Sequence, residues 1–282
     1  MSGKYSIGII GAGFVGTAIC KSFQHYVDVK IYDKFKHMGF TYPSVVAQDI
    51  LFICLPTPMK QDGSVDLSVL DNALRDLSTE VGEDTKIVII KSTVPPEVCR
   101  ELAHKFRNLR IFFSPEFLTE RTAELDFIQQ SRIIIGVPDD SEGAEERQIE
   151  GMFKTRFPYV PLVFVGWDEA SLIKYFTNVF FCTKIALFNE FAQIAEKLGL
   201  DPNQVAGEVL NDGRIGRSHW QVPGHDGRRG FGGSCFPKDI NGYMKFAREY
   251  GILPTVAQAA WEKNLEVRPE KDWEKLKGRA VS

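Results

Sequence analysis

Three glycines near the N-terminus restrict the fold of this chain more than any other feature. Gly11, Gly13 and Gly16 form the pattern G-x-G-x-x-G between an apolar run at residues 5–10 and a helical pattern at residues 15–23. After a strand and before a helix, such glycines allow a tight turn, the close approach of a pyrophosphate and close packing of helix against strand. The pattern therefore predicts a dinucleotide-binding turn at the start of a parallel sheet.

An acidic residue supports this interpretation. The next predicted strand, residues 27–32, ends at Asp33. This carboxylate follows the first glycine by about twenty residues, where it can accept hydrogen bonds from an adenosine ribose. Because a negative charge there repels a 2′-phosphate, we expect NAD rather than NADP, and only the neighbouring Lys34 could weaken that preference.

Strands and helices alternate as far as residue 166. Further strands are expected at residues 50–55, 86–90, 111–113, 133–137 and 162–165, with helices at 66–78 and 142–152 and another that ends at 106. This alternation predicts a Rossmann-like, doubly wound parallel sheet with its ligand at the carboxyl ends of the strands. Pro56, Thr93 and Glu116 all follow such ends. The Thr93 hydroxyl could cap the next helix or face a ligand, and its spacing favours the cap.

A long helix at residues 168–198 ends the alternation and begins an all-α part of the chain. It is apolar on several sides, which is typical of a buried helix at a subunit interface, so we expect a homodimer built on it. Lys174 and Asn178 are four residues apart and share one face, either as functional groups or as tolerated polar residues. Shorter helices are expected at 201–210, 237–250 and 255–266. We therefore expect an α/β NAD-binding domain at 1–166, a helical central domain at 167–267 and a charged, frayed tail at 268–282.

A cysteine in a glycine-rich turn is the most unusual feature of the helical part. Cys235 follows Gly230, Gly232 and Gly233 and precedes Pro237, and proline is favoured at the first position of a helix. The thiol would then lie just before a helix N-terminus, where free N–H groups and the helix dipole favour a thiolate. The alternative is an inert cysteine buried in a turn.

The loop that leads to this turn is rich in cations. Residues 211–233 contain Arg214, Arg217, Arg228 and Arg229 together with His219 and His225. Such a loop is commonly a solvated surface. Guanidinium groups also suit an anionic substrate, which this loop could hold beside the cysteine.

Composition argues against several other classes of protein. The 282 residues carry a formal net charge of −3, which suits two domains and argues against a dedicated nucleic-acid binder. Five cysteines without framework spacing indicate reduced thiols and a cytoplasmic location. Residues 1–4 lead directly into the first predicted strand, so we expect no signal peptide, and no apolar run is long enough to span a membrane. Histidines and cysteines are dispersed, so no metal site is predicted.

Together the motifs resemble those of the UDP-glucose/GDP-mannose dehydrogenase family over nearly the whole chain. The matching residues are Gly11-Ala12-Gly13-Phe14-Val15-Gly16, Leu55-Pro56-Thr57-Pro58, Lys91-Ser92-Thr93-Val94-Pro95-Pro96, Pro115-Glu116-Phe117-Leu118, Lys174-Tyr175 with Asn178, and Phe231-Gly232-Gly233-Ser234-Cys235-Phe236-Pro237-Lys238-Asp239. The order Cys-Phe-Pro-Lys-Asp is closer to the UDP-glucose branch than to the GDP-mannose branch, which tends to have Leu after the cysteine.

The resemblance implies a two-step, NAD-dependent oxidation of the primary alcohol of a nucleotide sugar, UDP-glucose in this branch, to a carboxylate. Cys235 would hold the aldehyde as a thiohemiacetal and then as a thioester, while Lys174 and Asn178 stabilise the oxyanions. Asp239 and Thr93 would position a water, with Glu116 as the base. By the same resemblance, substrate contacts are Glu116, Phe117, Leu118, Lys174, Asn178, Phe231, Gly232, Gly233 and Arg214, which in the family reaches a neighbouring subunit. Cofactor contacts are Gly11, Gly13, Phe14, Val15, Gly16, Asp33, Lys34, Thr57, Thr93 and Glu120.

Two departures from the family pattern concern the substrate. Arg121 stands where the family usually has glycine, which affects the local backbone. The family also carries a second Rossmann-like domain after its central helices, which grips the nucleotide, and this sequence ends at Ser282, where that domain is expected to begin. We therefore expect either a separate chain that supplies the domain or a loose grip on the nucleotide.

Two other functions fit part of these features. A 3-hydroxyacid or 6-phosphogluconate-type dehydrogenase also has an NAD-binding sheet followed by helices, but it needs no nucleophilic cysteine, so Cys235 argues against it. A non-catalytic, truncated NAD-binding dimer is the other alternative, and the intact motifs argue against such decay.

Overall fold

The chain divides into two compact units. The structure is a computed structural model that describes residues 5–282, so residues 1–4, which we expected to lead into the first strand without a signal peptide, lie outside the described residues. Unit 1 comprises Met1–Thr57 and Leu67–Lys174, and unit 2 comprises Pro58–Asp66 and Tyr175–Ser282. Each unit has hydrophobic clusters of its own.

Unit 1 is built on a seven-stranded sheet with the order β2-β1-β3-β4-β5-β6-β7. Its strands are β1 (Ser6–Ile10), β2 (Asp28–Tyr32), β3 (Ile50–Ile53), β4 (Lys86–Ile90), β5 (Leu109–Phe113), β6 (Ile133–Val137) and β7 (Leu162–Gly166). The first five strands are parallel, whereas β6 is antiparallel to β5 and β7 is parallel to β6. The predicted doubly wound α/β sheet is confirmed, but its last two strands are reversed. An apolar run has the same pattern in either direction, so the sequence did not reveal the reversal.

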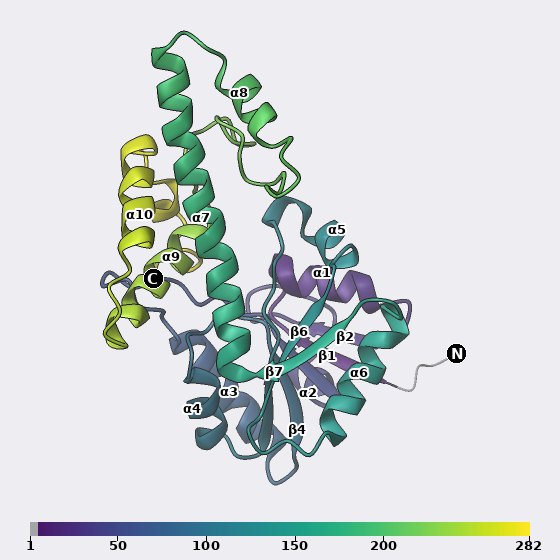
Figure 1. Cartoon of the computed structure of the whole chain (residues 1–282). Coiled ribbons are helices and arrows are strands. Elements are labelled where there is room, and N and C mark those ends of the chain that lie inside the picture. The colour runs from purple at the N-terminus through teal and green to yellow at the C-terminus, as the bar shows by residue number, and fades with distance from the viewer. Residues whose placement is uncertain (1–4) are drawn as a thin grey trace. The chain divides into compact units, whose positions relative to one another are not determined.

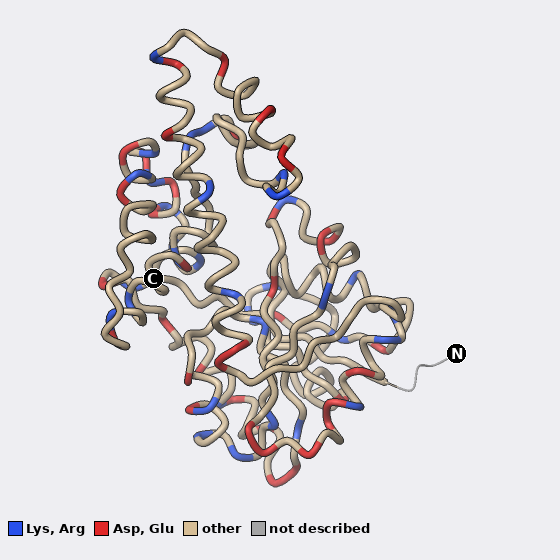
Figure 2. Tube along the Cα trace, in the orientation of Figure 1, with Lys and Arg blue, Asp and Glu red and all other residues tan. Residues whose placement is uncertain are grey.

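Helices cover both faces of this sheet (Figure 1). One face packs against α1 (Phe14–Phe23), α5 (Ala123–Ile128) and α6 (Ala144–Arg156), and the other against α2 (Tyr42–Val46), α3 (Ser68–Val81), α4 (Val98–Lys105) and the start of α7. Strands β1, β3, β6 and β7 contain no charged residue, and Figure 2 shows the charges of this unit mainly on the surrounding helices and loops. Apolar strands of this kind are expected where helices bury both faces of a sheet.

Unit 2 is helical. Its main element is α7 (Trp167–Lys197), which begins in unit 1 and confirms the long helix expected at residues 168–198. Within unit 2, α7 packs against α9 (Phe236–Glu249) and α10 (Thr255–Val267) in one cluster and against α8 (Pro202–Val209) in another. No helix within residues 5–282 is long and apolar enough to cross a membrane.

The expected helix cap at Thr93 is wrong. Helix α4 begins at Val98, and its N-cap residue is Glu97, whose φ is 70°. Pro95 and Pro96 delay the helix, because a residue that precedes proline is pushed out of the helical region. Two short helices, α2 and α5, were not predicted, since neither is long enough to show a clear helical period.

The expected fraying of residues 268–282 is also wrong. Arg268, Trp273 and Ala280 are buried, and Asp272–Lys275 form a short 3-10 helix. Met59, from the segment Pro58–Asp66 of the same unit, donates its N–H to the Ala280 carbonyl over 2.9 Å. Although residues 268–282 are rich in charge, the buried side chain of Trp273 holds this segment to unit 2.

Candidate active site

The glycine turn after β1 has the geometry of a phosphate cradle. A Cβ atom at Gly11, whose φ is 103°, would lie 2.4 Å from the Cys54 carbonyl oxygen, and one at Gly16 would lie 1.9 Å from the Gly11 oxygen. These two glycines are therefore required by close backbone packing. Gly13 differs, because nothing lies within 4 Å of where its Cβ would be and it immediately precedes α1. This open space at a helix N-terminus fits the pyrophosphate of a dinucleotide.

Asp33 is tied to the same turn. Its carboxylate accepts the N–H of Ala12 over 2.8 Å and the N–H of Phe35 over 2.9 Å. Burial opposes ionisation, but these two hydrogen bonds outweigh it and hold the pKa of Asp33 below its usual value. Lys36, which the sequence analysis overlooked, donates to the Ala12 carbonyl over 2.6 Å, whereas Lys34 is exposed. A charged carboxylate at this position fits the ribose of NAD.

Strands β3, β4 and β5 are neighbours, so the segments after their carboxyl ends meet at one edge of the sheet. The Thr57 hydroxyl donates to the Thr93 carbonyl over 2.8 Å, and the Ser92 hydroxyl donates to the Leu55 carbonyl over 2.6 Å. Thr93 itself is buried. Since it caps no helix, the other interpretation of its hydroxyl, that it faces a ligand, stays a prediction.

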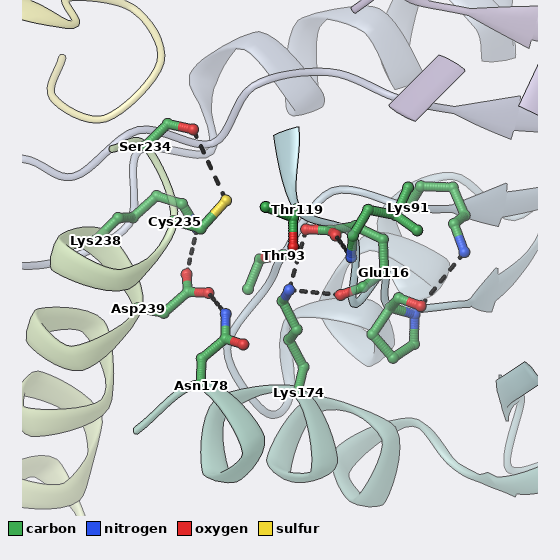
Figure 3. A network of polar contacts seen from close by, with 12 residues as sticks. Lys91, Thr93, Glu116, Thr119, Lys174, Asn178, Ser234, Cys235, Lys238 and Asp239 are labelled. Atoms are coloured by element: carbon green, nitrogen blue, oxygen red, sulfur yellow. Dashed lines mark hydrogen bonds and ion pairs between the residues drawn. The ribbon is translucent and has the colours of Figure 1, made fainter. Parts of the chain in front are cut away.

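Lys174 and Glu116 form a buried ion pair in unit 1 (Figure 3). The Lys174 Nζ donates to the Glu116 carbonyl over 2.5 Å and to its Oε1 over 3.0 Å. The Glu116 Oε2 accepts the N–H of Leu118 over 2.7 Å. The Lys174 side chain is only 2% exposed, so its ammonium is not in water as it would be in a snorkelling lysine. Helix α7 thereby places a cation at the end of β5.

Asn178 and Asp239 form a second buried pair, in unit 2 (Figure 3). The Asn178 Nδ2 donates to Oδ2 of Asp239 over 2.6 Å, and Lys238 donates from Nζ to Oδ1. Asp239 is fully buried, so both carboxylate oxygens are held by donors instead of water. This arrangement fixes the orientation of the carboxylate in the first turn of α9.

Cys235 is the N-cap residue of α9, which begins at Phe236. Its carbonyl accepts the N–H of Asp239 over 2.8 Å, and its Sγ lies 3.8 Å from the Ser234 hydroxyl (Figure 3). The residue is half-buried, unlike the buried Cys99 and Cys182. The predicted placement before a helix N-terminus is confirmed, and Cys235 is not fully buried, whereas its reactivity stays a prediction.

Three arginines of the cationic loop at residues 211–233 are paired with carboxylates. Arg214 is exposed and donates to Asp212 through Nε at 2.9 Å and Nη2 at 2.5 Å. Arg228 pairs with Glu270 and Arg229 with Glu196. Exposed ion pairs contribute little free energy, so Arg214 can exchange its carboxylate partner for an anionic ligand.

His219 is held by aromatic side chains of unit 2. Its ring stacks on Phe181 at 4.0 Å between centroids and meets Phe236 edge-on at 5.6 Å. Burial, with the charges of Lys184 and His225, lowers the pKa of His219, so the imidazole is neutral at pH 7. Phe231 is buried against Phe236 and Trp261, in the core beside the thiol turn.

The segment after Glu116 is exposed. The Phe117 ring lies 5.5 Å from the Lys174 Nζ, while Glu120 and Arg121 lie on the 3-10 turn Glu120–Thr122. Among the described residues other than glycine, only Glu97, His219 and Lys271 have a positive φ. Arg121 therefore replaces the family's usual glycine without backbone strain.

Lys91 was quoted in a motif but given no role by the sequence analysis. It is buried, and its Nζ donates to the Ser114 hydroxyl over 2.9 Å and to the Pro115 carbonyl over 3.4 Å. Burial lowers the pKa of Lys91 to about 8, against the opposing influence of Cys54 and Glu116. The sequence signal that could have identified this residue is a lysine placed directly after an apolar strand. No group of three or more His, Cys, Asp or Glu residues within 5–282 could hold a metal ion.

Comparisons with known proteins all indicate the same family of dehydrogenases. Residues 31–155 match the model of the UDP-glucose/GDP-mannose dehydrogenase family's NAD binding domain, and residues 168–266 match that of its central domain. The chain is 33% identical over 250 residues to UDP-glucose 6-dehydrogenase AglM of Haloferax volcanii. This matched region covers 84% of this chain and 57% of that protein. It is 32% identical over 234 residues to UDP-glucose 6-dehydrogenase TuaD of Bacillus subtilis, which covers 80% and 48%.

Solved structures agree with these matches. A UDP-glucose dehydrogenase from Pyrobaculum islandicum superimposes with a TM-score of 0.80 at 27% identity, over 99% of this chain and 72% of that one. The chain spans about half the length of the curated relatives named above. The match to the NAD binding domain, with the open space at Gly13 and the charged Asp33, confirms the predicted cofactor, NAD.

Proposed function

Because the chain belongs to the UDP-glucose/GDP-mannose dehydrogenase family, we propose that it oxidises the primary alcohol of a nucleotide sugar to a carboxylate. The relatives named above favour UDP-glucose as the substrate. The observation that carries the proposal is Cys235 at the N-terminus of α9, with Asp239 in the first turn held by Asn178. A 3-hydroxyacid dehydrogenase has no use for such a cysteine.

The proposed reaction consists of two oxidations that share a covalent intermediate. Bound NAD supplies the hydride acceptor for both. Glu116, whose Oε1 is paired with Lys174, takes the proton of the sugar hydroxyl while the carbon loses a hydride, and together these two losses leave an aldehyde. The Cys235 thiolate attacks the aldehyde carbon and forms a thiohemiacetal. Loss of the second hydride converts it to a thioester, so the aldehyde is never released.

Lys174 and Asn178 are the proposed oxyanion stabilisers. Each lies on α7, and each has its nitrogen fixed by a carboxylate, from Glu116 and Asp239 respectively. Donors that are already oriented need no reorganisation when charge develops on the sugar oxygen. Their spacing of one helical turn places them on the same side of α7.

Hydrolysis of the thioester completes the cycle. We propose that Asp239 and Thr93 position the attacking water, which donates a proton to Glu116 as base and forms the new C–O bond as the C–S bond breaks. The released thiolate of Cys235 is then ready for another aldehyde. Arg214 is the proposed contact to the diphosphate, since its fork is exposed and can accept an anionic partner.

A homodimer is proposed as the working assembly. Several large apolar side chains of α7 are exposed within unit 2, among them Phe180 at 65% and Ile194 at 56%. Between α7 and α8 lies an apolar cavity of about 310 Å³, lined by residues that include Phe191, Val205 and Trp220. Exposed apolar patches of this kind mark interaction surfaces, and a second copy would cover this one.

The direct test is NADH formation by the purified chain with UDP-glucose and, in parallel, GDP-mannose. The proposal requires NADH and the corresponding sugar acid with at least one of them. NADH formation from a simple 3-hydroxyacid and from neither nucleotide sugar would instead favour the alternative class of dehydrogenase.

A further inference from the structure

The turn that leads to Cys235 is held from behind by side chains at the end of unit 2. Asn264, on α10, accepts the N–H of Phe231 at Oδ1 over 2.7 Å and donates from Nδ2 to the Phe231 carbonyl over 3.0 Å. Asn264 is fully buried. One amide thus satisfies both backbone groups of a residue four positions before the thiol.

Arg268, one turn after Asn264, makes the second set of contacts. Its Nε donates to Oδ1 of Asp272 over 2.6 Å, its Nη2 to Oδ2 of Asp226 over 2.6 Å, and its Nη1 to the Arg229 carbonyl over 3.2 Å. The Arg268 side chain is 3% exposed. All three guanidinium nitrogens of Arg268 therefore donate hydrogen bonds within unit 2. Their acceptors are Asp226 and Arg229, which precede the turn in sequence, and Asp272, which follows it.

Asp272 connects this guanidinium to the glycine turn itself. Its Oδ2 accepts the N–H of Gly233 over 3.3 Å, and only Ser234 separates Gly233 from the cysteine. Burial opposes the charge on Asp272, but its hydrogen bonds with Arg268 and Gly233 outweigh that and lower its pKa. The pair is thus charged at neutral pH and firmly coupled to the backbone.

The glycines of the turn are fitted to these side chains. A Cβ at Gly232 would lie 2.5 Å from the Arg268 Nη2 and 2.5 Å from the Asp272 Oδ1. A Cβ at Gly230, whose φ is 65°, would lie 2.3 Å from the Asn264 Oδ1. The absence of a side chain at Gly230 and Gly232 is therefore explained here by the approach of Asn264, Arg268 and Asp272.

We propose that Arg268 is a positioning residue for Cys235. Arg268 acts on the thiol indirectly, through Asp272 and the turn at residues 230–233. The matched central-domain model ends at residue 266, so it assigns neither Arg268 nor Asp272 a role. With the turn fixed, the thiol stays at the N-cap position of α9, where the helix N–H groups favour the thiolate. Without Arg268, the turn keeps only its contacts with Asn264, Asp272 loses its guanidinium partner, and the thiol is held less firmly at that position. The effect on turnover rests on the proposed function, whereas the effect on the thiol does not.

The test measures the reactivity of Cys235 in the full chain without substrate. Iodoacetamide labelling at pH 7, followed at the Cys235 peptide by mass spectrometry, should slow about fivefold or more in Arg268→Met and Asp272→Asn. Lys275→Met is the matched control, because it removes an exposed cation from the same segment and should label at the wild-type rate. Equal labelling rates in all four proteins would overturn the proposal.

Turnover supplies the second readout. With UDP-glucose and NAD, Arg268→Met should lose about tenfold or more in kcat, because a small displacement of a reacting group is costly, while the KM for NAD stays unchanged. Arg268→Lys keeps the charge but lacks the fork, so it should rescue kcat only in part. If no protein forms NADH, the proposed function fails while the labelling result still decides the role of Arg268.

Hydrogen exchange of the wild-type chain is a third test, and it does not depend on whether any variant folds. The amides of Phe231 and Gly233 should exchange as slowly as those in the first turns of α9, and far more slowly than those of loop residues 213–219. Exchange of Phe231 and Gly233 at the rate of that loop would show that the turn is not anchored and would contradict the proposal.

Discussion

The side-chain amide of Asn178 donates a 2.6 Å hydrogen bond to the carboxylate of Asp239, which joins α7 to the first turn of α9 inside unit 2. Both side chains are buried, so neither can exchange the other for water. This contact orients the carboxylate that directly follows the thiol motif. It also makes unit 2 sensitive to small changes at Asn178.

Asn178→Asp should therefore destabilise the protein strongly at neutral pH. Two carboxylates would meet in a buried site, and the loss of a buried hydrogen bond alone costs about 1–3 kcal/mol. Urea unfolding at pH 7 measures the effect, with Asn211→Asp at an exposed position as the control. The loss should shrink as acidification protonates one carboxylate. A variant as stable as wild type at pH 7 would contradict this account of the pair.

The stability contribution of Lys91 should depend on pH. Burial lowers its pKa from 10.5 to about 8, so the unfolded chain binds more protons than the folded one between these values. The contribution of Lys91 to the free energy of unfolding should then rise with pH across this window, by up to about 3 kcal/mol, and should not vary with pH below it. Burial raises the pKa of Cys54 from 9.0 to about 12, so the unfolded chain loses this proton first and Cys54 opposes the trend in the upper part of the window. The contribution of Lys91 is therefore isolated by comparison with a variant.

The comparison that isolates this effect uses Lys91→Met. The difference in urea midpoint between wild type and variant, measured at pH 7.5 and at pH 10, should shift in favour of wild type at the higher pH. Parallel pH dependences of the two proteins would show that Lys91 titrates as in the unfolded chain.

Cofactor choice should depend on Asp33. Its charge, kept by the hydrogen bonds from Ala12 and Phe35, repels a 2′-phosphate, so NAD should bind at least about tenfold more tightly than NADP. Asp33→Asn should reduce this ratio and leave most of the NAD affinity, as measured by calorimetry. Equal affinities of the wild-type chain for the two cofactors would refute this role of Asp33.

The homodimer should dissociate when charge is introduced on the exposed side of α7. Ile194→Glu, at a side chain of α7 that is 56% exposed, should give monomers in sedimentation at micromolar concentration, whereas the wild type sediments as a dimer. Tyr159→Glu, at a 96% exposed aromatic residue of unit 1, is the control and should leave the dimer intact. A wild-type chain that sediments as a monomer would remove the basis of this proposal.

Much of the fold could be predicted because its signals are local. The glycine turn, the strand ends at Thr93 and Glu116, and the helix that starts after Cys235 all follow from short patterns of apolar residues, glycines and prolines. The reversal of β6 and β7 could not be predicted, since no residue pattern records the direction of a strand.

The partners of the site residues were not predictable for a different reason. The resemblance implied that Gly232 and Gly233 contact the substrate, and nothing in the sequence showed that Gly230 and Gly232 leave room for Asn264, Arg268 and Asp272. These residues lie more than thirty positions away along the chain, roughly beyond the reach of any local period. Helix packing brings them together, and only the structure shows it.

The central claim is that Cys235 carries the sugar as a thioester between the two oxidations. The most direct measurement is the ratio of NADH to sugar acid formed from UDP-glucose by wild type and by Cys235→Ser, together with the mass of the protein quenched during turnover. We predict two NADH per acid for wild type, a covalent adduct on the Cys235 peptide, and no acid from Cys235→Ser. Acid formed by Cys235→Ser at the wild-type rate would contradict the account.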